Sequence, residues 1–408
     1  MRTFSLGGVS AREEIAVERE NRFVRRARGF LVISTLTVAA MCIAATASNA
    51  QSAASRSSAS PGPPCKSSFN PYRYTEAQVQ ACGYSTYPVR AAADLAGGGS
   101  SVEYYLDGMT VKYLIPPAGF QPETASTAQL DQYGFPPRPT DSTSLVRWQK
   151  EMSGWKGAAP PTPFLTETHV QVVADTRNLQ NWAGYAITAE SNSLYWFTQA
   201  EGWYTEPTFG QSRCANPSEV TWAGLGGYPG YPGTGNYLAQ NGTAWNTPGA
   251  DNHQAWWEIV PHNYLTSIGY YGIPGGEMDV STRNVAPNGM RFWFYNYQDT
   301  SMAFDVTMYG NYFPAAQSAE VIAERPTVNK VYTDLANFGT LNIDGSAAAE
   351  DGNRTEIPFD QFPQNLNTTT GLWRHGVHMV SDTTGRDLAD PTSIVPDGAF
   401  NVTQNNCN

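Results

Sequence analysis

The stretch Ala319-Glu-Val-Ile-Ala-Glu324-Arg-Pro326 alternates in character along its length and then ends at a proline. In a β-strand, Glu320, Ile322 and Glu324 would share one face of a sheet. The small apolar residues between them would share the opposite face. The segment therefore predicts a strand that places two carboxyl groups on the same side of a sheet, where a carboxylate can hold a water molecule.

Similar short runs recur from about residue 181 onward. Glycine, proline, asparagine or aspartate separates them, and Asn288-Gly289 between two apolar runs is a strong hairpin signal. About ten such runs over roughly 220 residues indicate a β-sandwich or a barrel. The clearest of them are Trp182–Thr188, Ala255–Val260, Met290–Tyr297 and Met302–Met308.

The composition favours an exported protein with many turns. The 408 residues include 37 glycines and 28 prolines; 12% are aromatic and only 15% are charged. This profile is typical of an all-β extracellular protein and unlike that of a helical bundle. The formal net charge of −11 argues against nucleic acid as a partner, because phosphates require a basic surface.

The first 50 residues have the features of a secretory signal peptide. Four arginines between residues 22 and 28 precede the apolar run Phe30–Ala47, and Ser48-Asn49-Ala50 offers small residues at a cleavage site. An uncleaved membrane anchor is the alternative, because Phe30–Ala47 is close to the minimum length that spans a bilayer. We expect a secreted protein that keeps no stable membrane association once the signal is cleaved.

Residues 51–165 form a separate N-terminal region ahead of a β domain at residues 170–408. Residues 51–64 are a Ser/Pro-rich linker. The rest of the region is small and mixed in secondary structure. Its predicted elements are a strand at Met109–Ile115 and helices at Thr127–Gln132 and Ser144–Met152.

Four cysteines remain outside the signal: Cys65, Cys82, Cys214 and Cys407. In an oxidising compartment they predict two disulfides, for which three connectivities are possible. We favour the pairs 65–82 and 214–407, because each pair then lies within one region of the chain.

Six segments in order resemble the glutamic peptidase (eqolisin) family, over roughly Asn181 to Asn408. Each is a weak signal alone, but their order and spacing together are specific. The chain is similar to a secreted, bacterial-type member with an N-terminal extension. The segments are Asn181-Trp-Ala-Gly-Tyr185, Gly202-Trp-Tyr-Thr-Glu-Pro207, Trp222-Ala-Gly-Leu-Gly-Gly227, Leu238-Ala-Gln-Asn-Gly242, Trp256-Trp-Glu-Ile-Val-Pro261 and Ala319-Glu-Val-Ile-Ala-Glu324.

The resemblance implies a concanavalin-like β-sandwich of two antiparallel sheets and an acid endopeptidase activity. It makes Glu324 the general base, and Gln240 the group that orients the water and stabilises the oxyanion. With an ordinary pKa of about 4.3, such a glutamate is partly ionised in acid. Trp222 would line the substrate cleft, and Glu258 with Trp257 would support the catalytic pair. The family uses no metal or other cofactor, acts on proteins and peptides, and is monomeric.

The N-terminal region looks like the segment often found ahead of bacterial glutamic peptidase domains. It would be either a propeptide, which makes the chain a zymogen, or a permanent accessory domain. The sequence leaves both possibilities open.

Four positions depart from the family pattern. Gly226 and Gln254 stand where the family usually has aspartates, so the pH optimum is not implied by the resemblance. Val321 replaces an aromatic residue behind Glu324. The sequon that begins at Asn241 adjoins Gln240, so a glycan there would obstruct the site.

Other functions have partial support in the sequence. A glycosidase would pair Glu320 with Glu324, but on a regular strand their backbones lie about 13 Å apart. That exceeds the roughly 5–9.5 Å between the carboxyl groups of such enzymes. The pair His375 and His378 lacks a third metal ligand in register. A non-catalytic, lectin-like carbohydrate-binding module would stack sugars on exposed rings, for which the candidates are Trp256, Trp257, Trp293, Tyr295 and Tyr297.

Overall fold

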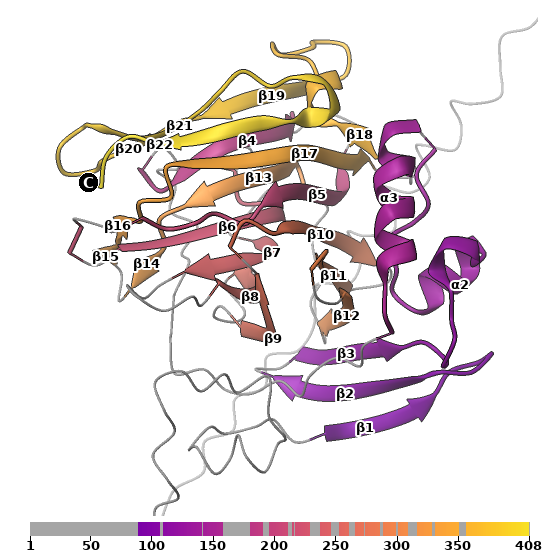
Figure 1. The fold of residues 1–408 in the computed structure, drawn as a ribbon. Coiled ribbons are helices and arrows are strands. Elements are labelled where there is room, and N and C mark those ends of the chain that lie inside the picture. The colour runs from indigo at the N-terminus through magenta and orange to yellow at the C-terminus, as the bar shows by residue number, and fades with distance from the viewer. Residues whose placement is uncertain are drawn as a thin grey trace, which may run out of the picture. The chain divides into compact units, whose positions relative to one another are not determined.

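Two large antiparallel sheets contain most of the strands in the computed structural model (Figure 1). All described residues lie within the compact unit 59–408. The predicted signal, the linker and the Cys65–Cys82 pair fall outside the described residues. The structure describes residues 89–106, 109–140, 142–157, 180–190, 196–210, 214–215, 217–228, 237–245, 253–260, 266–272, 274–285, 289–298, 301–308, 316–328, 331–350 and 356–407.

The larger sheet joins strands from both ends of the described chain. Its order is β1 (Val89–Asp94), β2 (Ser100–Leu106), β3 (Met109–Ile115), β12 (Ser301–Met308), β11 (Gly289–Asn296), β10 (Glu277–Val285), β5 (Phe197–Thr205), β17 (Thr340–Glu350), β22 (Phe400–Gln404), β21 (Asp387–Pro391) and β20 (Met379–Val380), with β18 (Ile357–Pro358) paired to β17.

The second sheet contains the carboxyl-bearing stretch that ends at Glu324. Its order is β19 (Leu372–Val377), β4 (Trp182–Ala189), β13 (Ser318–Glu324), β6 (Pro217–Leu225), β7 (Leu238–Trp245), β8 (His253–Val260) and β9 (Thr266–Gly272). The short strand β16 (Asp334–Leu335) pairs with β6 in parallel, and β14 (Thr327–Val328) pairs with β15 (Val331–Tyr332).

The prediction of an all-β sandwich of two antiparallel sheets is confirmed. An apolar core lies between the sheets and includes Ala319, Val321 and Ala323 of β13. Because alternate residues of a strand point to opposite faces, Glu320 and Glu324 face away from that core. A second apolar cluster covers their side of the sheet and includes Trp182, Trp222, Trp256 and Ile322.

The N-terminal region supplies three strands and two α-helices among the described residues. Strand β3 has the predicted bounds, Met109–Ile115, and pairs with β12, so the hairpins β1–β3 extend the larger sheet. Helix α2 also has the predicted bounds, Thr127–Gln132, and a Ser126 capping box begins it. Helix α3 is longer than predicted, at Ser142–Gly154. Three 3-10 helices lie among the described residues, at Pro122–Thr124, Phe359–Gln361 and Pro396–Gly398.

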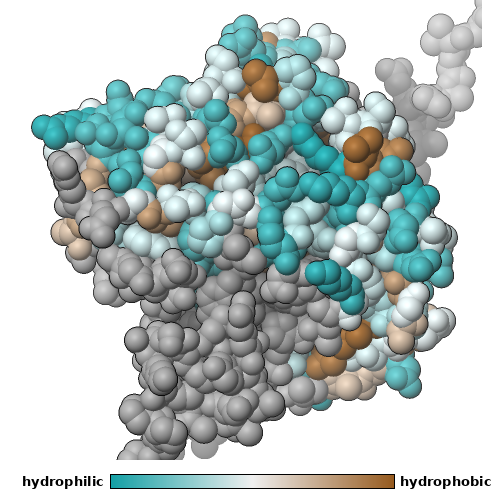
Figure 2. All heavy atoms as spheres, in the orientation of Figure 1, coloured by the Kyte–Doolittle hydropathy of each residue, from teal (hydrophilic) through white to brown (hydrophobic). Residues whose placement is uncertain are grey.

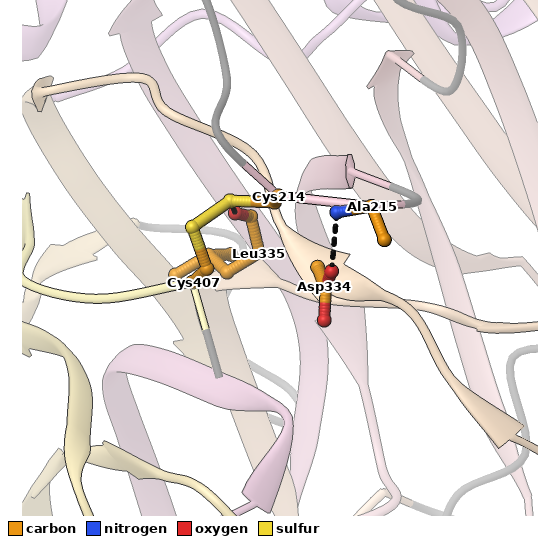
Figure 3. The surroundings of a disulfide bond; sticks show 5 residues. All are labelled: Cys214, Ala215, Asp334, Leu335 and Cys407. Carbon is orange, nitrogen blue, oxygen red and sulfur yellow. Dashed lines mark hydrogen bonds between the residues drawn. A yellow bond between two sulfur atoms is a disulfide. The ribbon is translucent and has the colours of Figure 1, made fainter.

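The predicted disulfide between Cys214 and Cys407 is confirmed (Figure 3). It links positions 193 residues apart in the sequence. Beside it, the Asp334 carboxylate accepts a hydrogen bond from the Ala215 backbone N–H at 2.8 Å. The bond therefore ties the segment before β6 to the C-terminal end of the described chain.

The surface in the view of Figure 2 is mainly hydrophilic, with hydrophobic residues in small separate groups. Within the described part of the chain, no helix combines the length and the apolar character needed to cross a bilayer.

Candidate active site

The face of the second sheet that points away from the core gathers the sequence-predicted polar residues. Gln240 of β7 lies directly opposite Gly224 of β6, and Gly224 lies opposite Glu320 of β13. On its other side Gln240 lies opposite Glu258 of β8. Residues paired in this way point to the same side of an antiparallel sheet. Gln240, Glu258, Glu320 and Glu324 therefore share one face.

Glu324 ends strand β13 and is completely buried. Its carboxyl group accepts two hydrogen bonds, one from Asn181 Nδ2 at 2.8 Å and one from Trp222 Nε1 at 2.7 Å. Burial raises the pKa of Glu324 to about 8, and these two hydrogen bonds act in the opposite direction. The carboxyl is therefore protonated in acid, contrary to the expectation from its ordinary pKa. Desolvation, which the sequence does not reveal, is the cause.

Gln240 is also completely buried. Its Nε2 donates to Glu258 Oε2 at 2.9 Å, while its Oε1 has no hydrogen-bond partner. Burial raises the pKa of Glu258, the bond from Gln240 lowers it, and the charge of Glu324 raises it again. Glu258 therefore holds the carboxamide in one orientation and lies close enough to Glu324 to respond to its charge.

The resemblance implies that Gln240 and Glu324 converge on one water molecule, and the structure does not bring these two side chains together. Gln240 is level with Gly224 on β6, whereas Glu324 is level with Val220, four residues away along the strand. That offset corresponds to about 13 Å along a flat strand. The Trp222 indole occupies the space between them, because its Nε1 reaches Glu324 and its Cζ3 would lie 2.8 Å from a Cβ on Gly224. A glycine at position 224 is what allows the ring to lie there.

Trp257 takes no part in this face. It points into the core between the sheets, where its ring stacks on Phe292 with 5.5 Å between centroids. It supports β8 from behind and cannot reach a substrate beside Gln240. Trp256, its neighbour in sequence, is the one that faces the site side and is completely buried.

Two residues near Glu324 were not singled out as site residues from the sequence: Asn181, which donates to it, and Trp182, which lies opposite it on β4. The Trp182 and Trp222 rings meet edge to face, with centroids 4.8 Å apart. Asn181 and Trp182 both belong to the first of the six matching segments. That membership was the signal that could have identified them.

The sequon asparagine is inaccessible in the folded protein. Asn241 is completely buried on the core side of β7. Its Nδ2 donates to the Trp293 carbonyl at 2.7 Å, and its Oδ1 accepts from Thr282 Oγ1 at 2.9 Å. Because both amide atoms are bonded between the sheets, the side chain is not available to carry a glycan beside Gln240.

The departures from the family pattern have local structural reasons at two positions. Gly226 has φ +86°, and a Cβ there would lie 2.6 Å from the Tyr237 carbonyl oxygen, so an aspartate would be strained. Val321 packs against Gly202 of β5, where an added Cβ would lie 3.1 Å from its Cγ1. A larger side chain at 321 would need another arrangement of the core.

The alternative functions find less support in the geometry. The register of β13 is uninterrupted from Ser318 to Glu324, so no bulge brings Glu320 closer to Glu324. His375 contacts Thr188 Oγ1 through Nε2 at 2.8 Å, whereas His378 contacts Asp390. Among the residues that the structure describes, no group of three or more His, Cys, Asp or Glu side chains could hold a metal ion. Most rings proposed for sugar stacking are buried, namely Trp256, Trp257, Trp293 and Tyr295.

Comparison with known proteins agrees with the six-segment resemblance. Residues 180–367 match the model of the Peptidase A4 family. No curated protein matches the chain. Among solved structures, scytalido-glutamic peptidase with a transition state analog inhibitor is 16% identical, over 55% of this chain and 98% of that one, with a TM-score of 0.42.

Two further solved structures are similar at the same level. SCP-B, a member of the eqolisin family in complex with the tripeptide Ala-Ile-His, is 13% identical over 55% of this chain and 98% of its own, with a TM-score of 0.39. Aspergilloglutamic peptidase from Aspergillus niger is 16% identical over 46% of this chain and 99% of its own, with a TM-score of 0.36.

Proposed function

We propose that this chain is a secreted acid endopeptidase in which Glu324 and Gln240 perform the hydrolysis; the match of residues 180–367 to the Peptidase A4 family model supports a glutamic-type peptidase. The observation that carries the assignment is the environment of Glu324. It is a completely buried carboxyl group, fixed by two donors on the same face as an oriented carboxamide.

The carboxamide of Gln240 has the groups that the reaction requires. A side-chain amide offers two N–H donors and one acceptor. One N–H donates to Glu258, which leaves the second for the carbonyl oxygen of a substrate, and Oε1 can accept a hydrogen bond from water. Because Glu258 holds the amide in place, little reorganisation is needed when charge develops on the substrate.

The raised pKa of Glu324 supports a mechanism that starts from the protonated carboxyl. As water attacks the scissile carbonyl carbon, one oxygen of Glu324 gives its proton to the carbonyl oxygen and the other takes a proton from the water. The product is a tetrahedral diol, and Glu324 is protonated again. Glu324 then protonates the amide nitrogen and takes a proton from a diol hydroxyl as the C–N bond breaks. An acid and an amine leave, and no net charge accumulates in the buried site.

Secretion is supported by features outside the site. A disulfide joins Cys214 to Cys407, and such bonds persist mainly in oxidising compartments. The arginine-rich start followed by the apolar run Phe30–Ala47 is the pattern of a signal peptide. Membership of a peptidase family implies protein or peptide substrates.

The test is cleavage of denatured casein between pH 2 and 6 by the wild type and by Glu324→Gln. We expect the variant to be inactive, because glutamine cannot transfer a proton. Glu320→Gln is the second variant, because Glu320 is level with Gln240 across Gly224 on the same face and is equally buried. Activity that is lost in Glu320→Gln and kept in Glu324→Gln would move the catalytic carboxyl to position 320 and contradict the proposal. Equal cleavage by Glu324→Gln and the wild type would contradict the proposal, and glycan binding without proteolysis would favour the lectin-like alternative.

A further inference from the structure

Helix α3 of the N-terminal region packs against the larger sheet and contacts β17, β5, β10 and β11 (Figure 1). Its buried residues Trp148 and Met152 join Trp293 and Tyr295 of β11 in one apolar cluster. Strand β3 adds the backbone pairing with β12. The N-terminal region is therefore connected to the peptidase sandwich both through a sheet and through a packed helix.

Gly345 of β17 leaves the space that Arg147 of α3 occupies. Arg147 Nη2 donates to the Asp344 carbonyl at 2.6 Å, and its guanidinium lies 5.0 Å from the centre of the Trp203 ring. A Cβ on Gly345 would lie 1.9 Å from Arg147 Nη1. Only a glycine at 345 leaves room for this contact.

Four carboxyl groups meet under α3, and we call them the acid cluster: Glu151 of α3, Glu201 of β5, Asp279 of β10, and Glu356 just before β18. All four are almost completely buried. Trp293 Nε1 donates to Glu151 Oε1, and the interaction between the Glu151 and Asp279 carboxyl groups contributes to the pKa of both.

The other side of the acid cluster is bridged by an amide. Gln199 Nε2 donates to Glu201 Oε2 and to Glu356 Oε1, each at 2.7 Å. The two basic residues of α3 are engaged elsewhere, Arg147 with Asp344 and Lys150 with Glu277. The charge of the acid cluster is therefore not balanced by the helix that covers it.

Protons are the remaining way to neutralise carboxyl groups in such a place. The pKa of Glu151 is raised to about 8, mainly by burial, and the charges of Glu201 and Glu356 contribute to this rise. Burial also raises the pKa of Glu201 and of Asp279, and the charge of Glu356 adds to both. The titratable or charged groups that border the acid cluster from the elements around it are Arg147 and Lys150 (α3), Glu277 (β10), Tyr295 (β11), Tyr297 (just after β11) and Asp344 (β17).

We propose that residues 89–157 are a permanent part of the working protein, held against the peptidase sandwich by protons that the acid cluster retains in acid, and that α3 loosens when higher pH removes them. This decides between the two roles left open for the region, in favour of an accessory domain. A propeptide released by acid would need an interface that weakens on protonation, and this interface strengthens.

The direction with pH follows from the raised values. A carboxyl whose folded-state pKa lies above its ordinary value contributes stability that is complete below about pH 4.5. That stability is lost as the pH rises through the folded value, which is about 8 for Glu151. The weakening of α3 should therefore fall between about pH 4.5 and 8.

Hydrogen exchange of the full-length secreted protein at pH 5 and pH 8 tests this, with rates corrected for intrinsic exchange. Measurements in a Glu324→Gln background exclude self-cleavage, so that the outcome does not depend on the proposed activity. We expect the α3 amides to exchange at least about tenfold faster at pH 8 than at pH 5. The strands of the second sheet serve as the internal reference and should not show this change. Equal protection of α3 at the two pH values would overturn the proposal.

Glu151→Gln should remove most of that pH effect, because its amide can accept from Trp293 and donate to Asp279 without a charge. Glu277→Gln is the matched control, since Glu277 is an exposed carboxyl at the same interface, and it should behave as the wild type. Identical pH responses in these two variants would refute the role of the acid cluster. Gly345→Ala should instead loosen α3 at both pH values, because its Cβ displaces Arg147.

Retention is tested separately with the active protein. After incubation at pH 3–4, intact mass and N-terminal sequencing should find residues 89–157 still joined to the active enzyme. Loss of the region in acid with gain of activity would show that it is a propeptide, and would overturn the proposal while leaving the assignment of Glu324 and Gln240 intact.

Discussion

Replacing Trp222 by phenylalanine tests whether Glu324 acts from its protonated or its ionised form. The substitution keeps an aromatic ring beside Gly224 and removes the indole N–H that donates to Glu324 at 2.7 Å. A hydrogen bond to a charged group is worth about 1.5–3 kcal/mol, and one pKa unit corresponds to about 1.4 kcal/mol. Trp222→Phe should therefore raise the pKa of Glu324 by about one to two units above its value of about 8.

The two forms predict opposite results in acid. With a pKa of about 8, only about one Glu324 carboxyl in a thousand is ionised at pH 5. If the protonated form reacts, kcat/KM of Trp222→Phe below pH 6 stays within about threefold of the wild type, and the fall in activity at high pH moves up by about one to two pH units. If the ionised form reacts, kcat/KM at pH 5 falls by about 10- to 100-fold, because the ionised fraction falls by that factor.

The assay is kcat/KM on an internally quenched peptide from pH 3 to 9, with circular dichroism at each pH to separate loss of activity from unfolding. Trp256→Phe is the matched control. Trp256 lies on the same face and is equally buried, but its indole N–H has no hydrogen-bond partner. Removing this N–H should therefore leave the pH dependence of kcat/KM unchanged. A wild-type rate that rises tenfold per pH unit between pH 4 and 7, with a 10- to 100-fold loss in Trp222→Phe, would refute the protonated-carboxyl mechanism.

Three further outcomes follow from the structure. Gln240→Ala should lower kcat by about 10²–10³ with little change in the circular dichroism spectrum, because it removes one oxyanion donor; a variant with wild-type kcat would remove Gln240 from the mechanism. Replacing Cys214 and Cys407 together by serine should lower the free energy of unfolding by about 2–5 kcal/mol in urea titrations, since the bond closes a loop of 193 residues; unchanged stability would show that the loop is constrained by other contacts. Secretion from a eukaryotic host should leave Asn241 of the folded, active enzyme unmodified by mass spectrometry, because both of its amide atoms are bonded between the sheets; an active enzyme with a glycan there would contradict this packing.

Much of the fold could be read from local pattern. Met109–Ile115 and Thr127–Gln132 form with the predicted bounds because each is delimited by its own signals, such as Pro116 after the strand and the Ser126 cap before the helix. The Asn288-Gly289 signal lies where β10 and β11 form an antiparallel pair. The two-residue strands β14, β15, β16, β18 and β20 were not predicted, because a pairing that short depends on what lies beside it in space.

In the candidate site, too, some features follow from local sequence pattern and others depend on what lies nearby in space. Alternation along β13 correctly places Glu320 and Glu324 on one face, since the period of a strand is a local property. The orientation of Trp257 was not recognised. The segment Trp256-Trp257 is aromatic at both positions, so its pattern does not indicate which ring faces the core.

By itself, the sequence predicted the fold class and the resemblance to glutamic peptidases, because alternation, turn residues and short segments are written along the chain; it favoured the Cys214–Cys407 pair among three possible connectivities, and the structure contains that disulfide. Only the tertiary structure decided the ionisation of the acids. The pKa of Glu324 and of Glu151 depends on how completely distant strands and α3 exclude water from them. Desolvation is a property of everything that surrounds a group, and no short stretch of sequence records it.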